Sequence, residues 1–158
     1  MSNIPDLLDY LVTTFTNSVT LGAATPPVKV IDGPVQILDP LPLALWVGVD
    51  DITAARDGNL ISAGASQQNW AGFGRLSRDE QAAISCVAGA WTGNNTFSPL
   101  RAAASAIVDA VEAIVKADTT APALFPNPGV TAAEWLQENT GNGLQVFVQF
   151  QIIYKVRL

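Results

Sequence analysis

The sequence carries little charge for a chain of its length. Only 14% of its 158 residues are Asp, Glu, Lys or Arg, whereas about 25% is usual in soluble globular domains. Apolar residues make up 49%, yet no uninterrupted apolar run reaches the roughly 18 residues that suggest a membrane span. We therefore expect protein, and no membrane, to cover the surplus apolar surface, in an assembly of many copies or many partners.

Histidine is absent and cysteine occurs once, as Cys86. The lack of imidazole excludes Ser-His-Asp and Cys-His catalytic pairs and histidine metal ligands. A lone cysteine cannot form an intrachain disulfide, so nothing indicates an oxidising compartment. Because Cys86 alternates with small residues, we favour a core thiol over a nucleophile.

The eight basic residues are scattered, and the formal net charge is −6. This argues against a protein that grips nucleic acid through its phosphates, which needs a cluster of Lys and Arg. The first six residues lack the basic start of a secretory signal, so export by that route is not expected.

One acidic loop is the strongest candidate for ion binding. Asp50 and Asp51 are followed by Asp57, and clustered carboxylates suit calcium or magnesium. The spacing does not match an EF-hand, so a solvated loop is favoured, with an acidic patch at an interface or lumen as the other alternative. Gly72-Phe73-Gly74 lacks the later glycine of a phosphate loop. We expect no metal, cofactor or catalytic residue.

Hydrophobic periodicity predicts two helices and several strands. Apolar residues at steps of three and four predict helices from Ile4 to Leu21 and from Leu100 to Lys116, the second with Ser98 as its N-cap. Short apolar or alternating runs predict the strands, which are Val28–Asp32, Leu43–Val49, Trp70–Leu76, Gln81–Thr92 and Leu144–Leu158. Residues 50–68 and 119–142 are expected as long connections, the second with a helical turn over Thr131–Leu136. Residues 77–80 are expected to join two strands.

The order of these elements predicts an α+β fold in one domain, residues 1–158. Both helices are expected on one face of a mostly antiparallel sheet, with the small even positions of Gln81–Thr92 packed against a helix. The last strand is too long for a small sheet to pair easily, so its far end is a candidate for pairing with a neighbouring subunit. Trp135, in a proline-rich loop, and Tyr154, in the last strand, are candidate assembly contacts.

Several stretches resemble the tail terminator proteins of long-tailed, non-contractile phages, especially those of actinobacterial hosts. They run in the family's order through most of the chain and comprise Ile4 to Val19, Asp32-Gly33-Pro34, Leu45 to Asp51, Gln68 to Gly74, Arg78-Asp79-Glu80, Ile84-Ser85-Cys86, Ala90 to Gly93 and the Ala-rich helix after Arg101. The proline-rich span from Pro122 to Pro128 matches no part of the family that we can name.

The resemblance implies a structural virion protein, assembled in the host cytoplasm, with one sheet and two helices. Such proteins form a ring, usually a hexamer, on the head-proximal end of the tail tube. The ring stops polymerisation of the major tail tube protein and then joins the head connector or stopper proteins. DNA passes through the lumen without specific binding, and Asp50, Asp51 or Asp57 facing inward would repel it.

Two alternatives stay open. A head-completion (stopper) protein or a tube-like tail subunit would share the fold class. It would differ from a tail terminator in its position along the head–tail axis of the virion. A small ligand-binding or hydrolytic domain would instead use the acidic loop, although the residue types for catalysis are largely missing.

Overall fold

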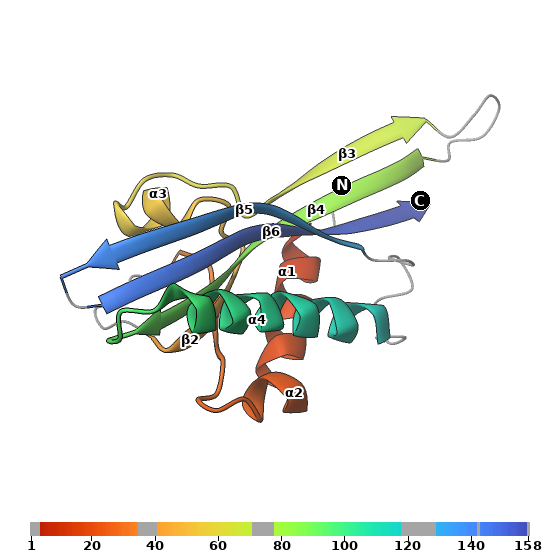
Figure 1. The fold of residues 1–158 in the computed structure, drawn as a ribbon. Coiled ribbons are helices and arrows are strands. Elements are labelled where there is room, and N and C mark those ends of the chain that lie inside the picture. Colours follow the sequence, from red (N-terminus) through yellow and green to blue (C-terminus); the bar gives the residue numbers. More distant parts are fainter. Residues whose placement is uncertain (1–3, 35–40, 71–77, 118–128, 142, 158) are drawn as a thin grey trace.

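The chain folds into a six-stranded sheet with helices on both faces, seen in the computed structural model of Figure 1. The structure describes residues 4–34, 41–70, 78–117, 129–141 and 143–157. The class is α+β with a mostly antiparallel sheet, as predicted. The elements are α1 (Ile4–Thr16), α2 (Val19–Gly22), β1 (Lys29–Asp32), β2 (Leu43–Val47), α3 (Ile52–Arg56), β3 (Gly64–Trp70), β4 (Arg78–Thr92), α4 (Phe97–Ala117), β5 (Gly129–Thr140) and β6 (Gly143–Arg157).

β4 is the central strand of the sheet, whose order is β1-β2-β4-β6-β5. One side of β4 pairs with β6. The other side is shared, because β2 pairs with the second half of β4 and β3 pairs with the first half. Among the described strands, only β1 and β2 run parallel. β3 and β5 therefore lie at opposite borders of the sheet.

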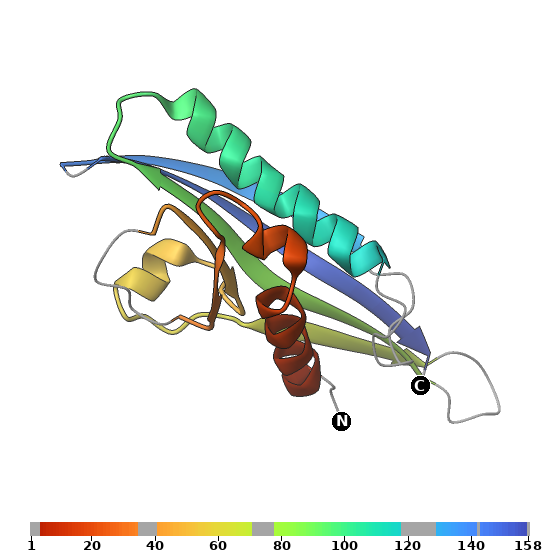
Figure 2. The same cartoon turned by 90° about the horizontal axis from the view of Figure 1, so that it is seen from below.

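The helices α1 and α4 cover one face of the sheet (Figure 2). Each buries one apolar stripe, as helical spacing predicts. β4 turns its even positions toward them, which confirms that the small residues of this strand pack against a helix. The buried members of this core from α1, β4 and α4 are Leu7, Leu11, Phe15, Ala82, Ile84, Cys86, Ala88, Ala90, Leu100, Ala104, Ile107, Val111 and Val115.

The opposite face carries a smaller core beneath α3. Phe147 and Val87 of the sheet pack there with residues of and before α3. The Trp46 and Phe147 rings meet edge to face, with centroids 6.0 Å apart. A Cβ at position 89 would lie 2.7 Å from the Trp46 ring, so only glycine allows this close approach.

Three predicted connections are partly regular structure. Residues 50–68 contain α3 and most of β3, and residues 78–80 belong to β4. The helical turn expected over Thr131–Leu136 is wrong, since these residues lie in β5. Ala, Glu and Leu favour helix by propensity, but pairing with β6 overrides that preference.

Smaller differences concern helix ends and the ends of two strands. The first helix stops at Thr16, and Ser18 caps a separate α2 by accepting a hydrogen bond from the Leu21 N–H. α4 starts one residue before Ser98, so Ser98 is not its cap. β2 ends at Val47 rather than Val49. Of the strand predicted over Trp70–Leu76, only Trp70 is described, as the last residue of β3; residues 71–76 lie outside the described residues, as does the span from Pro122 to Pro128.

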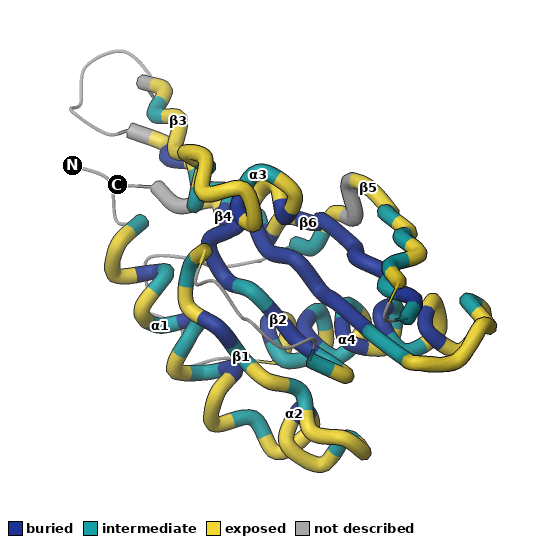
Figure 3. The backbone as a smooth tube through the Cα atoms, turned by 90° about the vertical axis from the view of Figure 1, so that its left-hand side faces the viewer, coloured by how far each residue is buried: buried dark blue, intermediate teal, exposed yellow. Residues whose placement is uncertain are grey.

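The sheet pairs β6 along almost its whole length on one side, and pairing of its far end with a neighbouring subunit on the other side stays a prediction. β4 and β6 have 15 residues each and pair antiparallel from Leu144 to Arg157. On its other side β6 pairs with β5 as far as Ile153. The sheet accommodates the long strand because β4 is equally long, and Figure 3 shows both strands largely buried.

Candidate functional site

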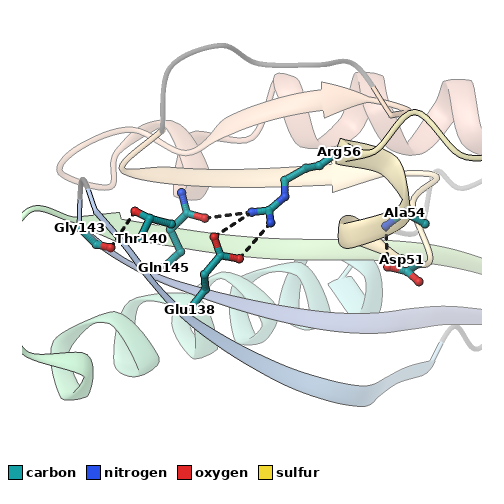
Figure 4. Close-up of polar contacts among 7 residues, drawn as sticks. All are labelled: Asp51, Ala54, Arg56, Glu138, Thr140, Gly143 and Gln145. Carbon is teal, nitrogen blue, oxygen red and sulfur yellow. Dashed lines mark hydrogen bonds and ion pairs between the residues drawn. The ribbon is translucent and has the colours of Figure 1, made fainter.

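The three candidate aspartates all lie exposed around α3, where two of them stabilise the local fold. Asp51 is the N-cap of α3, and its carboxylate accepts a hydrogen bond from the Ala54 N–H at 3.0 Å (Figure 4). Asp50 accepts one from the Ser62 N–H at 3.1 Å. Asp57 occupies the C-cap position of the same helix. The carboxylates of Asp50 and Asp51 thus hold the loop in shape, which is the usual role of Asp at caps and turns.

Nothing in the described part of the chain gathers three or more potential metal ligands of the His, Cys, Asp or Glu type. The acidic loop therefore does not form a recognisable cation site among the described residues.

A polar clamp holds α3 against the sheet. Arg56 donates two hydrogen bonds to the Glu138 carboxylate, at 3.3 and 3.0 Å, and a third to the Gln145 side chain at 3.3 Å (Figure 4). Its guanidinium also lies over the Phe147 ring, 5.9 Å from the centroid. At the start of α3, the buried Gln149 accepts a hydrogen bond from the Ile52 N–H and donates one to Glu134. β5 and β6 therefore fix the position of α3.

The two aromatic candidates lie in different environments. Trp135 is not in a loop but in β5, at the border of the sheet, where 48% of it is exposed. Tyr154 is 1% exposed and belongs to the main core. Trp135 is thus accessible at the surface, whereas Tyr154 packs in the core between the sheet and its helices.

Cys86 is a core thiol, as favoured from the sequence. Its side chain is completely buried, and this burial raises the pKa of the thiol to about 12. The thiolate is the nucleophilic form. Cys86 therefore stays protonated and shielded at neutral pH.

No protein-family model matches this chain, and no curated protein is significantly similar to it. None of the described helices combines the length and the apolar character needed to cross a bilayer.

Part of the sheet face that carries α3 is not covered by any described helix, and the sequence analysis did not predict this. Beyond α3, the strand residues on this face include exposed side chains of β3, β4 and β6, namely Ala65, Gln67, Asn69, Asp79, Gln81, Gln151 and Lys155. We call these seven residues the open sheet face. Only Asp79 and Lys155 are charged. The missing signal is apolar alternation in β3, in which none of the residues whose burial is described is fully buried.

Glu80 is a further feature that the sequence analysis missed. It occupies an even position of β4, so its side chain lies on the buried side of the sheet, and it is 1% exposed. Within the described residues, neither of its carboxylate oxygens has a hydrogen-bond partner. A buried carboxylate without a partner costs free energy, and the charged stretch Arg78-Asp79-Glu80 gives no hint of burial.

Proposed function

We propose that this chain is a structural assembly protein of a phage virion, a tail terminator that closes into a ring on the head-proximal end of the tail tube. The ring ends tube polymerisation and presents its other side to the connector or stopper proteins. Its mechanism is geometric, because one side matches the tube and the other does not recruit another tube ring.

The observation that carries this proposal is the low charge of the chain: Asp, Glu, Lys and Arg make up 14% of its residues, against about 25% in soluble globular domains. Interfaces are depleted of charge at their centre, so a chain of this composition is expected to cover part of its surface with neighbouring subunits. The α+β fold with two long helices on one face also agrees with what the resemblance implies.

The position of the three aspartates fits a lumen that does not bind DNA. Asp50, Asp51 and Asp57 are exposed on the side of the sheet that also carries the open sheet face. If this side turns inward in the ring, their negative charge repels the DNA backbone and keeps the passage clear.

The proposal is tested by adding the purified protein to polymerising tail tube subunits of the same virus and measuring tube lengths by negative-stain electron microscopy. We expect shorter, uniform tubes with a ring at one end, and overlong tubes without the protein. Light scattering coupled to size exclusion should show a ring, or a monomer that closes only on tube ends. A monomer that neither binds tubes nor changes their length would overturn the proposal.

The same experiment separates the alternatives. A ring that binds the connector but leaves tube length unchanged indicates a stopper. The Asp50→Asn/Asp51→Asn variant, compared with the wild type, tests the acidic loop: capping should persist, whereas a ligand-binding or hydrolytic function of these carboxylates would be lost.

A further inference from the structure

The outer sides of β1, β3 and β5 pair with no strand in the described parts of the chain. The short end of β6 beyond Ile153 is likewise unpaired on the side of β5. An unpaired edge offers a row of backbone N–H and C=O groups to any other strand, so proteins protect edges by shortness, charge, proline or bulges. The three edges differ in this protection.

β1 is protected and β3 is not. β1 has only four residues, and the charged Lys29 and Asp32 at its ends are exposed. β3 has seven residues, Gly64-Ala65-Ser66-Gln67-Gln68-Asn69-Trp70, without a charge or a proline. Figure 3 shows it largely exposed where it runs out from the body of the molecule beside β4. Its length and neutrality suit it for pairing with a further strand.

β5 provides the complementary edge at the opposite border of the sheet. A bulge between Ala132 and Glu134 interrupts its register, and the regular stretch after the bulge, Glu134–Thr140, is as long as β3. Its two carboxylates are already bound within the chain, Glu134 to Gln149 and Glu138 to Arg56. A neutral strand can therefore approach this edge without leaving an unpaired charge.

We propose that β3 of one copy pairs with the stretch Glu134–Thr140 of β5 in the next copy, so that one sheet continues from subunit to subunit. This inference rests on the proposed ring and names the surfaces that join it. Each copy gives one edge and receives a different one, which is a heterologous contact. Closure of the ring then leaves neither edge open, whereas pairing of β3 with β3 in a dimer would leave β5 uncovered.

Crosslinking tests the pairing directly, because the buried, protonated Cys86 does not compete for a maleimide. Ser66→Cys lies in β3 and Gln137→Cys in the middle of the β5 stretch. A short bismaleimide should join a mixture of the two single variants into dimers and convert the double variant into a series of multimers. Neither single variant should crosslink by itself. Dimers from Ser66→Cys alone, or rings without any crosslink, would overturn the inference.

Charge placed on the edge provides a second test. Ser66→Lys/Gln67→Lys puts two lysines on β3, and we expect it to weaken ring formation by about tenfold or more. The matched control Gln81→Lys/Gln151→Lys adds the same charge to exposed positions of β4 and β6, which are paired on both sides, and should stay within about twofold of the wild type. Circular dichroism checks that both variants fold. Equal weakening by both variants would place the contact on the sheet face and contradict the inference.

These outcomes separate the inference from the proposed function. Rings that cap tubes but show no β3–β5 crosslink would refute the inference and leave the function standing. Crosslinked multimers that do not affect tube length would refute the function and leave the pairing standing.

Discussion

Two ionisable side chains of β4 lie on the buried side of the sheet at even positions. Cys86 is completely buried beneath the helices, and Glu80 is 1% exposed near the start of the strand. Strand alternation places both inward regardless of their chemistry. A thiol suits this environment because its neutral form is stable there. A carboxylate without a hydrogen-bond partner is unfavourable in the same environment.

The thiol makes stability depend on pH. Burial raises the pKa of Cys86 from 9.0 to about 12. Above pH 9 the unfolded chain loses the thiol proton while the folded chain keeps it, so the stabilisation is full below pH 9 and is lost as the pH rises toward 12. The slope is about 1.4 kcal/mol per pH unit. In urea titrations, the loss of unfolding free energy between pH 8 and pH 10 should be about 1.4 kcal/mol larger for the wild type than for Cys86→Ala. Equal losses would contradict the assignment.

Replacing Glu80 should stabilise the fold. Glu80→Leu removes a buried carboxylate that has no hydrogen-bond partner in the described residues. We expect the free energy of unfolding to rise by about 1–3 kcal/mol. The neighbouring Gln81→Leu, at an exposed position of the same strand, is the control and should change it by less than about 0.5 kcal/mol. Chemical denaturation measures both, and a less stable Glu80→Leu variant would show that the carboxylate has a partner in the folded chain.

At the level of elements, α3 shows how contacts maintain a helix that propensity cannot. It has five residues, far below the length at which isolated helices persist. The Asp51 cap, the Arg56 clamp and the buried Ile52 and Ala55 hold it on the sheet. The helix therefore depends on tertiary structure, which explains why residues 50–68 show no helical period in the sequence.

Removing the cap should loosen α3 more than removing the neighbouring charge. Asp51→Ala deletes the acceptor for the Ala54 N–H and should cost about 1 kcal/mol. Asp57→Ala removes a carboxylate from the other end of the helix, where it is unfavourable to the helix dipole, and should cost nothing. Hydrogen exchange of the Ala54 amide provides a local measurement: protection should fall in Asp51→Ala only. Equal loss in both variants would mean that charge, rather than capping, stabilises the helix.

At the level of the whole molecule, the surfaces proposed to join copies carry little charge. Backbone pairing and apolar contact are weakly affected by salt, whereas ion pairs between exposed groups are screened as the Debye length falls from about 10 Å at 0.1 M to about 3 Å at 1 M.

The proposed ring should therefore resist salt. Between about 0.1 M and 1 M NaCl, we expect the fraction of protein in rings, measured by sedimentation velocity, to change by less than about twofold. The Ser66→Lys/Gln67→Lys variant serves as the control, because salt should partly restore its assembly by screening the added charge. Dissociation of wild-type rings at high salt would show that ion pairs hold the copies together.

Elements with strong hydrophobic periodicity were predictable. The stripes of α1 and α4, and the alternation in β4 and β6, each report a side that faces the core. The α+β class follows from their order. The acidic loop was predicted only in part: its exposed aspartates were expected, whereas α3 and the hydrogen bonds by which Asp50 and Asp51 hold the loop were not.

Tertiary structure alone decided the segments whose sequence shows no hydrophobic periodicity. β3 has no fully buried residue among those whose burial is described, and β5 contains a helix-favouring run that becomes a strand only because β6 lies beside it. The burial of Tyr154 and Glu80, and the exposure of Trp135, depend in the same way on which elements meet. The local sequence determines the hydrophobic periodicity of a segment and the charge of its side chains. Which groups become buried, and which strand pairs with an edge, depends on residues distant in the chain.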